Sequence, residues 1–291
     1  MALIVRGVKK AYNHQPALCG VDLDLQSGIV ALLGPNGSGK TTLLRILATI
    51  LSPEQGEINW RGYHYSGKLR PIRRQLGYLP QDLQLPEHLT PIKLMNYLAQ
   101  LKGGAEDSQI PNLLDELNLL PLAERPFGQL SPGQRRLVGV AQAFLGHPNL
   151  LLLDELTLGL DVREREAVFR LVRRHLEDRL VIFSTHIPSD VERLARVMII
   201  LKEGQVLYQG DVESFRTQVN GMVYELRTGI GEKTSIPGSS CVCRVKEDEH
   251  GSILRLVGQL PAGCPAFPVS ATLEDAYLYM LKNDSAFKIH P

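Results

Sequence analysis

Residues Gly34 to Thr41, with the sequence GPNGSGKT, place glycine, lysine and threonine in the order G-x-x-x-x-G-K-[ST]. They follow a short run of β-type residues and precede an apolar segment of helical periodicity, which is the context that this pattern requires. Glycines allow turns that bring backbone N–H groups against phosphate oxygens at a helix N-terminus. We therefore expect a phosphate-binding loop in which Lys40 neutralises the β- and γ-phosphates, Thr41 binds Mg²⁺ and Thr42 lies on the α-phosphate side. The alternative is a glycine-rich turn before an unrelated helix.

Two carboxylates stand directly after four leucines in the segment LLLLDELTLGLD, which runs from Leu150 to Asp161. An uninterrupted run of leucines predicts a buried strand, so Asp154 and Glu155 are expected at the end of that strand. An acid in this position completes the magnesium site of phosphate-loop proteins, and Asp154 suits that part. Glu155 lies one residue further along, within reach of a water in line with the γ-phosphate, as a general base. The alternative for Glu155 is a solvated loop carboxylate.

Three other segments carry polar residues next to predicted elements. Gln81 follows the strand-like segment QLGYL, and His186 follows the β-rich segment LVIFST, where a lone histidine is usually a surface residue. Ser131 and Pro132 are explained by a helix start alone, as N-cap and first helical residue. Gly133 is not, because glycine in a first turn lowers helix stability unless something approaches its backbone closely. The start of that helix is a ready anion site.

Taken together, these segments resemble the ATP-binding cassette (ABC) family, and specifically the nucleotide-binding subunit of an ABC transporter. The resemblance rests on the order and spacing of six motifs over about residues 1–213. The motifs are GPNGSGKT (Walker A), Gln81 in YLPQD (Q-loop), LSPGQ from Leu130 to Gln134 (signature), LLLLDE (Walker B), LTLGLD (D-loop) and His186 in STH. The later segment ATLEDAYLYML resembles the tail of cassette subunits of the ABC-2 exporter type.

The resemblance implies ATP and Mg²⁺ as cofactors and a role for each matching residue. Tyr12 stacks on adenine, Gln81 touches Mg²⁺ and senses the attacking water, and His186 contacts the γ-phosphate within its own subunit. The implied metal ligands are Thr41, Gln81 and Asp154, and the implied catalytic residues are Glu155, His186 and Gln81. The implied nucleotide-binding residues are Tyr12, Gly34, Pro35, Asn36, Gly37, Ser38, Gly39, Lys40, Thr41, Thr42, Ser131, Gly133 and Gln134.

The signature residues imply a shared site. In the family, Ser131 and Gly133 bind the γ-phosphate of the nucleotide held by the other subunit. The chain is therefore expected to work as a homodimer or as a heterodimer with another ABC subunit. A monomer is expected to bind ATP but to hydrolyse it poorly.

The chain departs from the family pattern in two motifs. Pro132 stands where the signature usually has glycine, and proline has no N–H to donate to a phosphate. Leu156 stands where the family nearly always has proline after the glutamate, and Leu158 where a small residue is common. The changes at Leu156 and Leu158 predict a D-loop that is less rigid or differently packed, with more effect on communication between the two sites than on ATP binding.

The elements that position these residues predict an α/β fold. We expect a P-loop NTPase core with an antiparallel β subdomain in residues 1–213 and an inserted helical subdomain at about 82–147. One helix of the insert is predicted from Thr90 as N-cap, with Pro91 in its first turn. Residues 214–291 predict a small α+β appendage of a strand, a hairpin around the turn segment EDEHG and a final helix.

Composition limits the classes of function. The 291 residues carry a net charge of +1, with 44% hydrophobic and 22% charged residues, as in a globular protein of one or two domains. A near-neutral balance gives no case for direct nucleic-acid binding. No apolar run approaches the roughly 18 residues of a membrane-spanning helix, and the N-terminal segment lacks the features of a signal peptide. The four cysteines follow no metal-binding spacing and are expected to be free thiols.

The sequence predicts an ATPase subunit, cytoplasmic and peripheral at the cell membrane, which dimerises around two ATP molecules and powers a separate permease, in the direction of export. The helical insert is expected to receive that permease. A soluble ABC-type ATPase acting on ribosomes or nucleic acid and a degenerate regulatory subunit that binds ATP without turnover remain alternatives. A P-loop kinase would have no reason to carry LSPGQ and STH. The cargo is not encoded in this chain.

Overall fold

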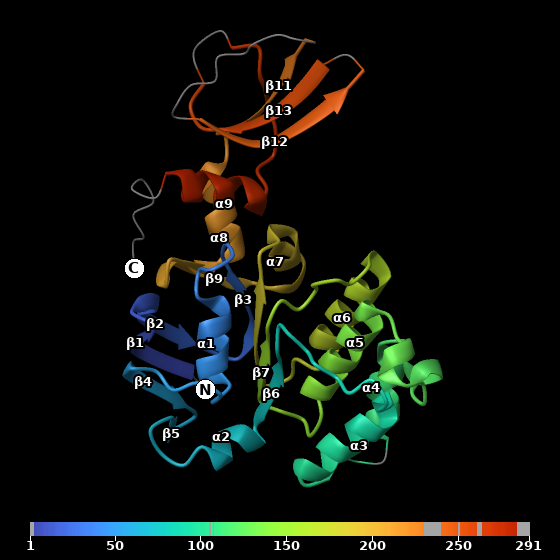
Figure 1. Ribbon diagram of the computed structural model, residues 1–291. Coiled ribbons are helices and arrows are strands. Elements are labelled where there is room, and N and C mark those ends of the chain that lie inside the picture. The colour runs from blue at the N-terminus through green and yellow to red at the C-terminus, as the bar shows by residue number, and fades with distance from the viewer. Residues whose placement is uncertain are drawn as a thin grey trace. The chain divides into compact units, whose positions relative to one another are not determined.

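The computed structural model describes residues 3–104, 106, 108–229, 240–249, 251–260 and 264–283 (Figure 1). Their contacts divide the chain into two units. The first unit comprises residues 1–186 and 197–209, and the second comprises 187–196 and 210–291. The sequence placed a boundary after residue 213, whereas these contacts group residues 187–196 with the C-terminal part. The boundary of the ATPase domain at residue 213 stays a prediction.

A six-stranded sheet forms the centre of the first unit, in the order β10-β9-β3-β8-β7-β6. β3 pairs in parallel with β8 and β9, and β7 pairs in parallel with β6 and β8. Parallel strands present their carboxyl ends at one edge of a sheet, and ligands bind at such edges. The strands are β3 (Gly28–Leu33), β6 (Leu76–Leu79), β7 (Leu150–Leu153), β8 (Leu180–Thr185), β9 (Val197–Lys202) and β10 (Gln205–Asp211).

The hydrophobicity of the central strands follows from burial on both faces. All four leucines of β7 and all six residues of β8 are buried. Helices cover both faces of parallel sheets, so such strands are apolar throughout rather than alternating. The leucine run before Asp154 is therefore a central strand, as its sequence predicts.

An antiparallel sheet in the order β2-β1-β4-β5 lies beside helix α1 (Figure 1). Leu43, Leu44, Ile46 and Leu47 of α1 belong to one hydrophobic cluster that also contains Leu3 and Trp60 of the antiparallel sheet and Ile182 of the parallel sheet. The helix that follows the phosphate loop is thus held between the two sheets. The elements are β1 (Leu3–Tyr12), β2 (Gln15–Leu25), β4 (Gln55–Trp60), β5 (Tyr63–His64) and α1 (Lys40–Leu47).

Helices dominate the segment between β6 and β7, as predicted for residues 82–147. α3 begins after Thr90 with Pro91 in its first turn, and buries Met95 and Ala99. The sequence prediction for this helix is confirmed. The helices of the first unit are α2 (Arg70–Arg74), α3 (Pro91–Leu101), α4 (Gln109–Glu116), η1 (Leu120–Leu122), η2 (Phe127–Gln129), α5 (Pro132–Ala143) and α6 (Val162–Arg174).

The second unit combines a four-stranded sheet in the order β12-β13-β11-β14 with helices. β12 and β13 form the antiparallel hairpin that was predicted around EDEHG, and α9 is the predicted final helix. The elements are α7 (Pro188–Leu194), α8 (Val212–Arg216), η3 (Thr217–Val219), β11 (Val223–Thr228), β12 (Cys241–Asp248), β13 (Gly251–Val257), β14 (Phe267–Pro268) and α9 (Leu273–Lys282). Within the described residues, no helix is long and apolar enough to span a membrane.

A buried ion pair joins α9 to the sheet of the second unit. Arg255 on β13 donates to both carboxylate oxygens of Asp275 at 2.9 and 2.8 Å, and to Glu225 on β11 at 3.2 Å. The backbone N–H and the hydroxyl of Thr272 each donate to Asp275 at 2.8 Å. Burial opposes ionisation of Asp275, but the hydrogen bonds from Arg255 and Thr272 outweigh it and hold the pKa of this carboxyl below its ordinary value.

Asp275→Asn is expected to destabilise the second unit by about 1.5–3 kcal/mol at pH 7, because Arg255 loses a charged acceptor. The folded pKa of Asp275 lies below the unfolded one, so its contribution is present above an unfolded pKa of about 3.9 and is lost as the pH falls through the folded pKa. Hydrogen exchange of the α9 amides should therefore separate wild type from variant at pH 7, and the difference should shrink on acidification below about pH 4.

Glu274→Gln is the matched control for this experiment, because Glu274 is the neighbouring acid on α9 and pairs with Arg244 at the surface. An exposed pair contributes about 0–1 kcal/mol. Equal protection of α9 in the two variants at pH 7 would contradict a structural role for the Asp275 pair.

Candidate nucleotide site

The phosphate loop follows β3 directly and ends where α1 begins at Lys40. The ammonium group of Lys40 folds back over the loop and donates to the carbonyl oxygens of Gly34 at 2.7 Å and Pro35 at 3.1 Å. Gly34 has to be glycine, because a Cβ at this position would lie 2.2 Å from the carbonyl oxygen of Leu201. The loop therefore wraps tightly around a buried cation, at the start of a helix whose N–H groups attract anions.

Lys40 is only 6% exposed. Burial lowers its pKa below the ordinary lysine value, and the charges of Glu155 and Asp154 act against that shift. Its Nζ atom lies 3.9 Å from Oε1 of Glu155. The groups within hydrogen-bonding distance of Lys40 are carbonyl oxygens. A polyphosphate that enters the loop would therefore place negative charge beside a cation that has no anionic partner at that distance.

Asp154, at the end of β7, is completely buried. Its Oδ1 atom accepts a hydrogen bond from the hydroxyl of Ser184 at 2.6 Å, and its Oδ2 atom is buried without a partner among the described residues. Burial raises the pKa of Asp154, while the hydrogen bond from Ser184 and the nearby side chain of Thr41 oppose that rise. A buried carboxylate oxygen with no partner is the feature expected of a group that awaits a cation or its bound water.

Glu155 is not the solvated loop carboxylate of the alternative hypothesis, because it is only 7% exposed. Its Oε2 atom lies 3.0 Å from Nδ1 of His186, which follows β8. Its backbone has φ +48°, a left-handed conformation that residues other than glycine rarely adopt. Both of its main-chain groups are held, the N–H by the hydroxyl of Ser184 at 2.7 Å and the carbonyl by Arg136 at 2.7 Å.

The three residues assigned to magnesium lie together. The hydroxyl of Thr41 donates to Oε1 of Gln81 at 3.0 Å. The Thr41 side chain is also close enough to Asp154 to act against the rise in the pKa of that carboxyl. Mg²⁺ in proteins usually keeps several waters and takes one or two carboxylates plus phosphate oxygens. One hydroxyl, one amide oxygen and one carboxylate with a free oxygen fit that requirement, so Thr41, Gln81 and Asp154 would hold the ion.

The signature segment begins α5 as its sequence predicts. Ser131 is the N-cap, Pro132 opens the helix, and Ser131 and Gln134 form a reciprocal capping box with bonds of 3.1 and 3.0 Å. Gly133 is closely approached by Glu164 of α6, whose carboxylate oxygen would lie 2.6 Å from a Cβ at this position and would have to move for any larger residue. Within one chain, Ser131 and Gln134 therefore bind each other, and their contact with a nucleotide stays a prediction.

Two predicted features lie outside the group of residues around Lys40. Tyr12 ends β1, paired with Gln15, and its side chain is 43% exposed, which leaves ring surface for stacking on a base. Leu156 is completely buried and its N–H donates to the carbonyl of Ser184 at 3.3 Å, a bond that proline could not make. The D-loop is thus anchored at its first residue by a hydrogen bond. Its greater flexibility stays a prediction.

Sequence reasoning missed three residues that touch this site: Ser184, Glu164 and Arg136. Ser184 stands two residues before His186 and is buried between both Walker B carboxylates. Glu164 is the third residue of α6 and approaches Gly133. A serine inside an otherwise apolar strand was an available signal for Ser184, whereas nothing in the local pattern of the signature helix indicated the contacts of Arg136.

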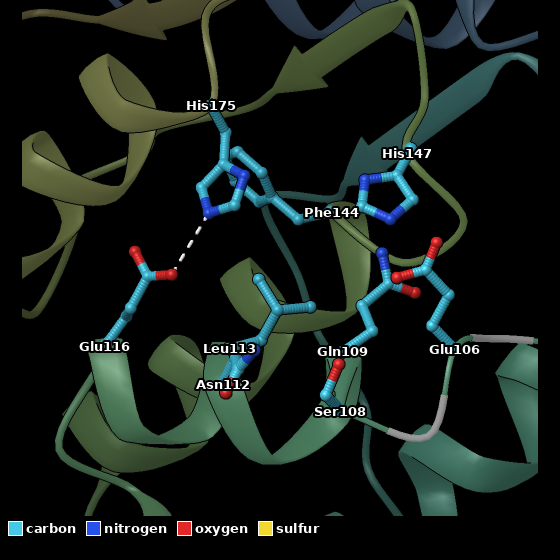
Figure 2. Close-up of a pocket in the computed structure, with 9 residues that line it drawn as sticks. All are labelled: Glu106, Ser108, Gln109, Asn112, Leu113, Glu116, Phe144, His147 and His175. Carbon is cyan, nitrogen blue, oxygen red and sulfur yellow. Dashed lines mark hydrogen bonds and ion pairs between the residues drawn. The ribbon is translucent and has the colours of Figure 1, made fainter.

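A hollow lies in the first unit between α4 and the C-terminal ends of α5 and α6 (Figure 2). Its volume is about 110 Å³. Several of its polar groups have partners within the protein. Nε2 of His175 lies 3.2 Å from Glu116, and Gln109 accepts a hydrogen bond from the N–H of Gly146 at 3.1 Å. The ring of Phe144 meets His175 edge to face at 5.7 Å. These contacts give the hollow a structural explanation without a ligand.

A phosphate loop after β3, a histidine after the adjacent strand β8 and buried acids after the next strand, β7, define a P-loop nucleotide-binding protein. Residues 18–158 match the family model described as ABC transporter. The chain is 30% identical over 288 residues to the Nod factor export ATP-binding protein I of Burkholderia thailandensis, covering 93% of this chain and 94% of that protein. It is 32% identical over 283 residues to the sulfate/thiosulfate import ATP-binding protein CysA of Pseudomonas syringae pv. tomato, covering 90% and 86%.

Comparison with solved structures indicates the same family. The dimeric post-hydrolysis structure of the ATP-binding cassette MJ0796, bound to ADP and Pi, superimposes with a TM-score of 0.67 at 26% identity, over 72% of this chain and 98% of that one. The chain belongs to the ABC transporter ATP-binding proteins. Its fold is the ABC ATPase fold, with a parallel core, an antiparallel subdomain and a helical insert.

Ser184→Ala is expected to lower turnover and stability together. It leaves the N–H of Glu155 and Oδ1 of Asp154 without their partner, at a cost of about 1–3 kcal/mol. Thermal unfolding and ATPase rates at saturating magnesium and ATP measure the two effects. Ser184→Thr keeps the hydroxyl and should retain more activity than the alanine variant. Wild-type turnover in Ser184→Ala would show that the hydroxyl does not position the two acids.

Proposed function

We propose that this chain is the ATP-hydrolysing subunit of a transporter, that two copies or two related subunits enclose two ATP molecules, and that the cycle drives a separate membrane permease in export. The observation that carries the hydrolytic part is the buried Glu155 carboxylate, which lies 3.0 Å from Nδ1 of His186 and 3.9 Å from Nζ of Lys40. A carboxylate between a histidine and the phosphate-binding lysine is placed to act on a water beside the γ-phosphate.

In this proposal each residue of the site has its own role. Lys40 and the backbone of the phosphate loop bind the β- and γ-phosphates, and Tyr12 stacks on the base. Thr41, Gln81 and Asp154 would hold Mg²⁺, which would supply positive charge to stabilise the phosphate oxygens during transfer. Glu155 accepts a proton from the attacking water, while His186 orients the Glu155 carboxylate and contacts the γ-phosphate. Gln81 lies beside Thr41, within the same site, where its amide can respond to the metal and the water.

Dimerisation is supported by the incomplete character of the single-chain site. The first turn of α5, with Ser131 and Gly133, is a helix N-terminus suited to an anion, and we assign it to the nucleotide of the opposite subunit. The MJ0796 cassette to which this chain is similar is described as dimeric with ADP and Pi. Closure around ATP and reopening after hydrolysis would then supply the motion that the permease uses.

A cytoplasmic position at the membrane surface, through a permease partner, follows from the same proposal. Export is favoured by the C-terminal segment ATLEDAYLYML, which forms α9, and by the whole-length similarity to a protein named for export. CysA, to which the chain is also similar, is named for import. The cargo would be selected by the permease.

Glu155→Gln is expected to reduce the ATPase rate by about 10²–10⁴-fold, the range typical of removing a general base, while ATP binding persists. The amide cannot accept the proton from water, so an ATP-bound dimer should accumulate, visible by size-exclusion chromatography with light scattering. Lys40→Ala is the control, because it should lose nucleotide binding and therefore the dimer. Unchanged turnover in Glu155→Gln would remove the general-base assignment. ATP binding without any turnover in wild type would favour the degenerate regulatory subunit.

The partner is tested by affinity purification of the chain from native membranes solubilised in mild detergent, with mass spectrometry of the proteins that co-purify. A stoichiometric protein with several membrane-spanning segments is expected, because this chain needs a permease to couple hydrolysis to transport. Recovery only from the soluble fraction, together with ribosomes or DNA, would instead support the alternative of a soluble ABC-type ATPase.

A further inference from the structure

Arg136 lies in the second turn of α5 and is only 7% exposed. Its guanidinium donates through Nη1 to the carbonyls of Pro80 at 2.8 Å and Gln81 at 2.9 Å. Through Nη2 it donates to the carbonyls of Asp154 and Glu155, the latter at 2.7 Å. Arg136 thus binds the main chain of two loops that are distant in the sequence. The carbonyl of Gln81 is 55 residues away, and that of Asp154 is 18 residues away.

These four carbonyls lie just beyond the region where β6 and β7 pair with each other. The strands pair from Leu76 to Leu79 with Leu150 to Leu153, and the N–H of Asp154 makes a further bond to Leu79. Past that point the two segments no longer pair with each other, so their carbonyls need donors from elsewhere. An arginine supplies several donors in a fixed planar fork, which suits it to hold two diverging segments at a constant separation.

The four residues include three that the site depends on. The Gln81 side chain meets Thr41, Asp154 meets Ser184, and Glu155 meets His186. A carbonyl and its own side chain share one Cα, so a shift of the backbone moves the functional group. Glu155 in particular holds a rarely adopted φ of +48°, and such conformations persist only where the surroundings enforce them.

We infer that Arg136 is a positioning residue for hydrolysis: it fixes the backbone of Gln81, Asp154 and Glu155, and so sets the magnesium ligands and the general base relative to one another and to α5. The inference rests on the proposed function of this same site. Because Ser131 and Gly133 begin the helix that carries Arg136, displacement of α5 would move both loops together. Arg136 thereby links the signature segment to the metal ligands within one chain.

The test compares Arg136→Gln and Arg136→Lys with wild type in three measurements: thermal stabilisation by ATP in EDTA, the Mg²⁺ concentration that gives half of the additional stabilisation, and kcat with KM. ATP binding in EDTA depends on the phosphate loop and should stay within about 2-fold of wild type, since the hydrogen bonds of Arg136 go to the segments after β6 and β7. The half-saturating Mg²⁺ concentration should rise about 10–100-fold, the usual effect of losing support behind metal ligands. kcat should fall about 100-fold with little change in KM.

Gln142→Leu is the matched control. Gln142 lies on the same helix and donates to the carbonyl of Tyr78 in β6 at 2.7 Å, so it also ties α5 to β6 but touches neither loop. This variant should lose stability while keeping the wild-type Mg²⁺ dependence. Arg136→Lys keeps a charge but not the planar fork, so it should lie between wild type and Arg136→Gln. It also carries the test if the glutamine variant does not fold.

A wild-type Mg²⁺ dependence and kcat in Arg136→Lys, or changes in Arg136→Gln no larger than those in Gln142→Leu, would overturn the inference and leave Arg136 as a structural contact. The outcome is distinct from failure of the proposed function. That failure would appear in the wild-type protein itself, as the absence of stabilisation by ATP or of turnover.

Discussion

The site depends on one buried hydroxyl. Ser184 of β8 donates to Asp154 at 2.6 Å and accepts from the N–H of Glu155 at 2.7 Å, so it satisfies the first acid and fixes the backbone of the second. Two adjacent carboxylates would otherwise be expensive to bury. The hydroxyl lies there because β7 and β8 are neighbours in register in the parallel sheet, with Leu153 opposite Phe183.

Charge balance follows from the same arrangement. Lys40 and Arg136 bring two buried cations to Asp154 and Glu155, but neither forms a close hydrogen-bonded pair with a carboxylate. Lys40 is held by loop carbonyls and Arg136 by the carbonyls that follow β6 and β7. The cations thus compensate the acids at longer range and leave Oδ2 of Asp154 open. A magnesium ion with a triphosphate can enter such a site without breaking a short ion pair.

The two departures from the family pattern have local structural explanations. Pro132 occupies the first position of α5, where the N–H would have no partner within the helix. Leu156 is buried and donates its N–H to the carbonyl of Ser184. Because Glu155 is followed by leucine rather than proline, it also has more freedom to adopt its left-handed backbone. The same serine residue therefore touches Asp154, Glu155 and Leu156.

The sequence alone determined the phosphate loop, the leucine strand that ends at Asp154, the start of α5 at Ser131 and the hairpin and helix near the C-terminus. Each of these follows from spacing or propensity within a few residues, because turns, caps and strand burial are local properties. Only the tertiary structure decided that Ser184 lies between the acids and that Arg136 binds two loops. These contacts join residues between 18 and 56 positions apart, and no local pattern encodes which distant strand ends will meet. The parallel sheet brings them together, because it places the ends of β3, β6, β7 and β8 at one edge.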